Sequence, residues 1–170
     1  MHRIRRAVAA AALLLVTTAA CVAAQTTVIL VRHAEKAAEP ADDPPLTREG
    51  QARAQRLAEY LRDAGVDAIY STAYARTTET AKPLADRIGV PITPAPLQGG
   101  IAASARELAT RLRNHRNQTV LVVGHSNTIG PVIEALGAPR IPPIADEDFE
   151  NLFIVIITAD GTASLVRARF

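Results

Sequence analysis

Short apolar runs alternate along the chain with stretches of helical periodicity, and this alternation limits the fold more than any other feature of the sequence. Strands are predicted over 26–31, 66–71, 91–94 and 119–124, and helices over 47–64, 75–88, 104–115 and 127–136. Such alternation predicts an α/β fold, a three-layer α/β/α sandwich around a mainly parallel sheet. Residues 152–158 and 162–167, separated by a short polar turn, add an antiparallel hairpin at one edge.

The first 24 residues follow a different pattern. Three arginines within residues 1–6 precede an apolar stretch over 7–16, and small residues close the segment at Ala24. This order is typical of a secretory signal peptide, so we expect cleavage after Ala24 and one domain over 25–170. The protein is therefore expected to be exported, as a periplasmic or secreted form.

Three other interpretations of this segment stay open. Cys21 could carry a lipid anchor, although Thr18 stands where such signals prefer a large aliphatic residue. An uncleaved membrane anchor is disfavoured because the apolar stretch is shorter than the roughly 20 residues that span a bilayer. A buried helix of the domain is disfavoured because the segment is not amphipathic.

Charge and composition exclude several classes of protein. The formal net charge of +2 belongs to the leader, since residues 25–170 hold 16 basic and 17 acidic residues, a net charge of −1. Aromatic residues make up only 4% of the chain, so no basic face interleaved with aromatics is available for nucleic acid. A single cysteine excludes a disulfide framework within the chain and a multi-cysteine metal cluster.

Two predicted strands run directly into histidine at the edge where parallel sheets bind ligands. Arg32 and His33 follow the strand at 26–31, and His125 follows the strand at 119–124. Arg76 lies near the start of the helix after the strand at 66–71. Two imidazoles and two guanidinium groups are thus predicted on one rim.

This set of groups suits phosphoryl chemistry. Arginine forks bind phosphate oxygens bidentately, and Ser126 and Asn127 open a helix whose backbone N–H groups add donors. A neutral imidazole can attack phosphorus and give a phosphohistidine that water hydrolyses. The sequence therefore predicts a phosphate pocket with a histidine nucleophile in it.

The same residues resemble the histidine phosphatase superfamily, with its phosphoglycerate-mutase-like fold, in the short bacterial branch. The motifs are RHAEK at 32–36, LTREGQARA at 46–54, STAYARTTETA at 71–81 and VVGHSNT at 122–128. The resemblance implies that His33 is the phospho-accepting nucleophile and that Arg32 and Arg76 bind phosphate. It implies that His125 contacts the phosphoryl group. Ala34 departs from the glycine that related enzymes carry at that position.

The general acid is not evident from the sequence. The resemblance implies a carboxylate in the segment after the third strand, and residues 94–104 contain none. Glu35, next to the nucleophile, and Glu107 are the candidates, with the loop acids Glu39, Asp42 and Asp43 behind them. Glu107 also completes a predicted capping box with Ser104. A substrate with a good leaving group, such as a phosphohistidine or an acyl phosphate, needs little acid help.

The leading hypothesis is an exported, metal-independent phosphatase acting on phosphoesters or phosphohistidine, with a small phosphorylated substrate or a phosphoprotein as partner and no cofactor. One alternative is a phosphoester-binding module of the same fold without turnover. Another is a phosphoglycerate-mutase-type phosphotransferase, which is disfavoured because residues 94–104 are few and poor in Arg and Lys. Two histidines without an evident third ligand argue against a zinc site.

Four further features receive a structural interpretation. His115 and the basic run 111–116 are expected on a solvated helix face, and 146–148 in a solvated acidic loop. Tyr74 is either a packing residue or part of the pocket wall beside Arg76.

Overall fold

Ten elements of secondary structure make up the protein, which a computed structural model describes over residues 25–170. The strands are β1 (Thr26–Arg32), β2 (Val66–Ser71), β3 (Ile92–Pro94), β4 (Thr119–Gly124), β5 (Asn151–Ile157) and β6 (Ala163–Arg169). The helices are α1 (Arg48–Tyr60), α2 (Ala75–Ile88), α3 (Ile101–Arg113) and α4 (Ser126–Ala135). The predicted signal peptide, with Cys21, lies outside the described residues.

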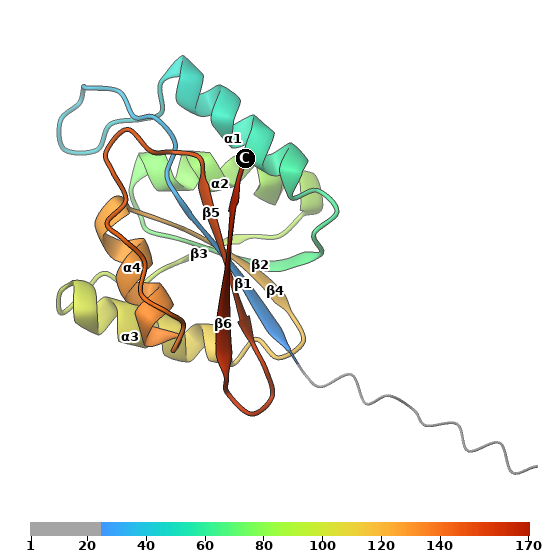
Figure 1. Ribbon diagram of the computed structural model, residues 1–170. Helices are drawn as coiled ribbons and strands as arrows, with labels where there is room; N and C mark the ends of the chain where they lie inside the picture. The colour runs from blue at the N-terminus through green and yellow to red at the C-terminus, as the bar shows by residue number, and fades with distance from the viewer. Residues whose placement is uncertain (1–24) are drawn as a thin grey trace, which may run out of the picture.

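All six strands join one sheet in the order β3-β2-β4-β1-β5-β6. The four strands β3, β2, β4 and β1 run parallel to one another. β5 then pairs antiparallel with β1, and β6 pairs antiparallel with β5. This confirms the mainly parallel sheet with a C-terminal hairpin at one edge, which Figure 1 shows.

Helices cover both faces of the sheet, and the alternation of side chains along β1 shows why. Val28 and Leu30 point into a core shared with α3 and α4. Ile29 and Val31 point into a second core shared with α1 and α2. A strand with consecutive apolar residues, as at 28–31, must be covered on both sides. The three-layer arrangement predicted from sequence is therefore confirmed (Figure 1).

The start of α3 differs from the sequence expectation. The helix begins at Ile101, with Gly100 as its N-cap at φ 83°, and the predicted capping box from Ser104 to Glu107 does not form. Ser104 lies in the first turn, and its hydroxyl donates to the carbonyl oxygen of Gln98 at 3.0 Å. The glycine adopts a left-handed conformation at little cost, so the helix can start one turn earlier.

The start of α1 is fixed by a side-chain cap, and its end is set by where burial stops. Its start agrees with the predicted range, since Thr47 is the N-cap and its hydroxyl accepts a hydrogen bond from the N–H of Gly50 at 3.1 Å. The helix ends at Tyr60, before the predicted end at Ala64, and Ala64 is exposed. Leu61 is the last buried residue of that face, so the residues after it gain nothing from continuing the helix.

α1 packs directly on the backbone that follows β1, and Gly50 allows this approach. A Cβ atom on Gly50 would lie 2.2 Å from the carbonyl oxygen of Glu35. We therefore expect Gly50→Ala to lower the free energy of unfolding by about 1–3 kcal/mol, because the clash is with backbone. Urea unfolding measures this. Gln51→Ala, at the exposed neighbouring position, is the control and should stay within about 0.5 kcal/mol. Equal stability of both variants contradicts the close contact.

Over residues 25–170, no helix combines the length and the apolar character that crossing a membrane requires.

Candidate active site

The carboxyl ends of β1 and β4 bring two histidines together. Arg32, the last residue of β1, lies opposite Gly124, the last residue of β4. The N–H of His33 donates to the carbonyl oxygen of Gly124 at 2.9 Å. The rings of His33 and His125 lie 5.4 Å apart between centroids, at an angle of 66°. Residues 92 positions apart in sequence thus share one site because their strands are parallel neighbours.

His33 is held in one tautomer. Its Nδ1 lies 2.7 Å from the carbonyl oxygen of Ala34, an acceptor, so Nδ1 carries the proton. Burial lowers the pKa of His33 to about 4, and the nearby guanidinium groups of Arg32 and Arg76 act in the same direction. The ring is therefore neutral near pH 7, with a lone pair on Nε2. A neutral imidazole with a free nitrogen is the form that can attack phosphorus.

His125 is positioned by the start of α4 and by Thr72, directly after β2. Its N–H donates to the hydroxyl oxygen of Thr128 at 2.8 Å, and its Nε2 lies 3.0 Å from the hydroxyl of Thr72. Burial lowers the pKa of His125 to about 4. Ser126 and Asn127 form the first turn of α4, where backbone N–H groups precede the intrahelical hydrogen bonds. This helix start can bind an anion beside the two rings.

Arg32 is buried, and part of its guanidinium group is hydrogen-bonded to the loop around Asp146, which the sequence predicted to be solvated. Its Nη1 donates to the carbonyl oxygens of Ala145 and Asp146, each at 2.8 Å. The ring of Phe149 lies 4.4 Å from the guanidinium carbon. Its Nε is one of two buried side-chain nitrogens without a hydrogen-bond partner among residues 25–170. That N–H is available to a phosphate oxygen.

The expectation for residues 146–148 is thus corrected in part. Asp146 is exposed, as expected, but its backbone holds Arg32. Phe149 extends this contact, lying 6.4 Å from the ring of His33 between centroids. The only sequence signal was the position of Phe149, one of three phenylalanines, directly after three acids. A contact across more than 110 positions leaves no periodic trace in the sequence.

Arg76 joins the cluster from the first turn of α2. Its guanidinium carbon lies 4.3 Å from the ring centroid of Tyr74, and that ring stands edge-on to His125 at 5.5 Å. Nη1 of Arg76 lies 3.9 Å from Oδ1 of Asp43. The same carboxylate of Asp43 also accepts a hydrogen bond from the N–H of Ala75 at 2.8 Å. Tyr74 therefore forms part of the wall of the site, one of its two predicted roles.

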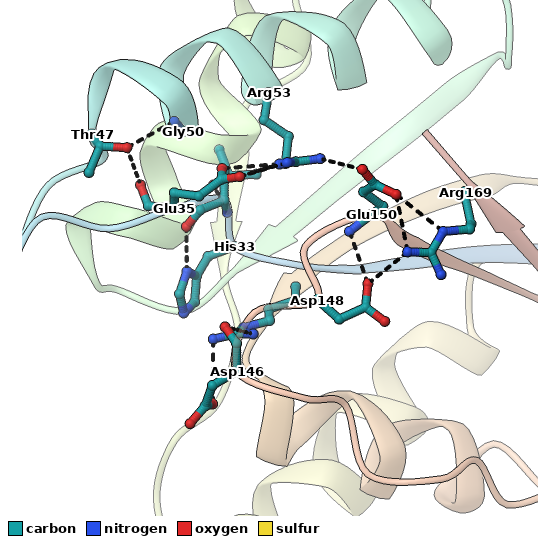
Figure 2. A network of polar contacts seen from close by, with 12 residues as sticks. His33, Glu35, Thr47, Gly50, Arg53, Asp146, Asp148, Glu150 and Arg169 are labelled. Carbon is teal, nitrogen blue, oxygen red and sulfur yellow. Dashed lines mark hydrogen bonds and ion pairs between the residues drawn. The ribbon is translucent and has the colours of Figure 1, made fainter.

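Neither leading candidate for the general acid is free at the site. Both carboxylate oxygens of Glu35 accept from Nε of Arg53, at 2.8 and 3.0 Å. Figure 2 shows this pair facing away from the His33 ring and continuing through Glu150 to Arg169. Glu107 pairs with Arg111 at 2.6 Å on an exposed part of α3. Both carboxylates are engaged in ion pairs.

His115 is not on a solvated face, contrary to the sequence expectation. Its Nε2 lies 3.0 Å from the hydroxyl of Tyr70, and its Nδ1 lies 2.6 Å from Oε1 of Gln118. Two polar partners and a half-buried position give it a structural role at the end of α3. Among residues 25–170, no group of three or more His, Cys, Asp and Glu side chains is arranged to hold a metal ion.

The depressed pKa of His33 predicts how stability depends on pH. The unfolded state takes up a proton near pH 6.5, whereas the folded state takes it up only near pH 4. The free energy of unfolding should therefore fall as pH is lowered through this window, by about 1.4 kcal/mol per pH unit for this one histidine. Urea unfolding between pH 7.5 and 4.5 measures the slope. His33→Gln should make it shallower, and an unchanged slope contradicts the burial of a neutral ring.

Comparison with known proteins agrees with the resemblance that the sequence motifs indicate. The sequence model of the histidine phosphatase superfamily (branch 1) matches residues 28–97, which include Arg32, His33 and Arg76. A comparison with curated proteins found no match.

Several solved structures share the fold. The protein histidine phosphatase SixA, solved with tungstate, has 18% identity and a TM-score of 0.68, covering 84% of this chain and 96% of its own. A protein from Nakamurella multipartitia, assigned as phosphohistidine phosphatase SixA, has 25% identity and a TM-score of 0.62, covering 85% and 96%. The mycobacterial glucosyl-3-phosphoglycerate phosphatase has 15% identity and a TM-score of 0.64, covering 86% and 98%. This chain therefore shares the fold of these phosphatases over almost their whole length.

Proposed function

This chain belongs to the histidine phosphatase superfamily, and on that premise we propose that it is a metal-independent phosphatase that forms a covalent phosphohistidine on His33. Family membership supports phosphatase activity as the class of reaction. The observation that carries the mechanism is the state of His33. Its Nδ1 is tied to the carbonyl oxygen of Ala34 at 2.7 Å, and the neutral ring keeps Nε2 free beside Arg32 and Arg76.

Two displacements complete the proposed cycle. Nε2 of His33 attacks phosphorus, the P–O bond to the leaving group breaks, and the leaving oxygen departs with the electron pair. Water then attacks phosphorus, the P–N bond breaks, and inorganic phosphate leaves with the neutral ring restored. Charge on the equatorial oxygens is stabilised by Nε of Arg32, by Arg76 and by the first turn of α4.

The ion pairs of Glu35 and Glu107 indicate which leaving groups the substrate can carry. Because Glu35 and Glu107 both lie in ion pairs, neither is free to protonate a poor leaving group such as an alkoxide. The proposed substrates therefore carry good leaving groups: a phosphohistidine on a protein, or a small acyl or aryl phosphate. Alkyl phosphate monoesters are expected to turn over more slowly.

Hydrolysis of p-nitrophenyl phosphate in excess chelator tests the proposal. We expect turnover without added metal, and a phosphoenzyme that is labile to acid and stable to alkali when the reaction is quenched. Activity that appears only with a divalent cation contradicts the mechanism. Interconversion of 2- and 3-phosphoglycerate would instead favour the phosphotransferase.

A binding module without turnover is the second candidate. The observation that favours it is again the absence of a free carboxylate among the described residues that contact the two histidines. Calorimetry that detects phosphate binding, with no turnover of acyl phosphate, aryl phosphate or phosphohistidine protein, would establish this alternative.

Export is a further part of the proposal and rests on the pattern of residues 1–24 alone. We expect the chain to be recovered outside the cytoplasm with Gln25 as its first residue, which N-terminal sequencing measures. A mature chain that begins with a lipidated Cys21 would replace the soluble form by an anchored one. A chain retained in the cytoplasm with Met1 intact contradicts export.

A further inference from the structure

An apolar pocket of about 160 Å³ lies next to the two histidines, because residues that contact both of them line it. It opens between the loop after β3, helix α3 and helix α4. Its apolar wall consists chiefly of Leu97, Ile101, Ala105, Leu108, Ile129 and Val132. Leu97 and Ile101 are 44% and 43% exposed, so they form an apolar rim at the surface.

The pocket adjoins the reacting groups directly. Thr72 lines it, and the hydroxyl of Thr72 lies 3.0 Å from Nε2 of His125. Gly124 also lines it, and the carbonyl oxygen of Gly124 accepts from the N–H of His33 at 2.9 Å. A substrate whose phosphorus lies at Nε2 of His33, before the P–O bond breaks, would therefore have its leaving group close to this wall.

The chemistry of the wall disfavours a strongly polar occupant. No charged residue lines the pocket. The hydroxyl of Ser104 donates to the carbonyl oxygen of Gln98, and that of Thr128 is bonded to the backbone of His125. Thr72 is bonded to His125 and Thr77. A sugar or nucleoside placed here would leave its own hydroxyls unpaired, which costs free energy.

The size of the pocket sets the size of the occupant. An apolar cavity of about 150 Å³ accepts a benzene ring and otherwise stays dry. We propose that this pocket is a specificity site for the apolar part of the leaving group, of about the size of one aromatic ring or a short alkyl chain. This proposal rests on the function proposed above. It narrows the substrate class to acyl or aryl phosphates with an apolar group next to the phosphate.

Binding of alkylphosphonates to the full-length chain tests the proposal without turnover, because their C–P bond is not hydrolysed. Calorimetry should show affinity rising from methyl- to butylphosphonate by about fourfold for each methylene buried. Phenylphosphonate should bind at least as well as butylphosphonate. Equal affinity across the series overturns the proposal, and so does failure of any phosphonate to bind.

Rim variants make the test specific. Leu97→Ser and Ile101→Ser replace exposed side chains, so the fold should persist, and they should reduce butylphosphonate affinity about threefold or more with methylphosphonate unchanged. Val166→Ser, at a residue 48% exposed on β6, is the matched control and should change neither. A loss that is equal for both ligands, or shared by the control, overturns the proposal.

The two proposals fail separately. Turnover of p-nitrophenyl phosphate with no chain-length dependence of phosphonate binding overturns the pocket and leaves the phosphatase standing. Chain-length-dependent binding without any turnover overturns the phosphatase and leaves an apolar phosphonate site.

Discussion

Replacing His33 with alanine should reduce kcat toward p-nitrophenyl phosphate by at least about a thousandfold, because the covalent route depends on one nitrogen atom. No other group in the cluster can take over. His125 has its Nε2 within 3.0 Å of the Thr72 hydroxyl, and Arg32 and Arg76 are cationic. Steady-state assays in chelator measure kcat, and acid-labile phosphate on the protein should vanish with it.

His115→Ala is the matched control for this substitution. That imidazole is half-buried and, like His33, hydrogen-bonded, but its partners are Tyr70 and Gln118. It follows α3, and its carbonyl oxygen accepts from the hydroxyl of Thr26 at the amino end of β1, away from the two catalytic rings. It should retain kcat within about twofold even if it lowers stability, since a neutral hydrogen bond contributes about 1 kcal/mol to folding and nothing to the reaction. If His33→Ala keeps more than a tenth of wild-type kcat in chelator while His115→Ala behaves the same, His33 is not the nucleophile.

Apolar runs and parallel pairing made the position of the histidines predictable. The short β-branched run 26–31, with four consecutive apolar residues at 28–31, favours a strand covered on both faces. Once β1 and β4 are parallel neighbours, their ends must meet, and His33 and His125 follow those ends. This argument needs no knowledge of loops, and for that reason it located both rings.

Loop contacts were not predictable by the same argument. Asp146 and Phe149 reach Arg32 from a segment without periodicity, and the acidic composition of 146–148 indicated solvent. The segment meets solvent and Arg32 at once, because the carbonyl oxygens of Ala145 and Asp146 face Arg32 while the Asp146 carboxylate is exposed. Composition reports on side chains and says nothing of backbone oxygens, which are the groups that hold the arginine.

The capping-box motif predicted the wrong start for α3, because a nearby glycine starts the helix earlier. Ser104 and Glu107 have the spacing of a capping box, but Gly100 at φ 83° starts the helix earlier. Glu35 was a candidate for the general acid. Its partner proved to be Arg53, 18 positions away on α1 and only 8% exposed. Only the packing of α1 on the loop after β1 brings that pair together.

Arg32→Lys should lower kcat/KM by about a hundredfold to a thousandfold, the usual effect of removing one preorganised donor from a developing oxyanion. The guanidinium has two tasks that one ammonium group cannot share. Nη1 holds the carbonyl oxygens of Ala145 and Asp146 at 2.8 Å, while Nε remains unpaired and faces no protein acceptor. A lysine Nζ can satisfy the loop or the phosphate, but it lacks the fork that does both.

The matched control is Arg113→Lys. Nη2 of Arg113 donates to the carbonyl oxygen of Leu136 at 2.8 Å, so this variant also removes a guanidinium bonded to backbone, but away from the two histidines. It should keep kcat/KM within about twofold and show a similar loss of stability in urea. If Arg32→Lys loses stability and keeps its activity, Arg32 serves the loop alone. If it loses activity with stability intact, the unpaired Nε is the group that meets the phosphate, which separates the two tasks of one side chain.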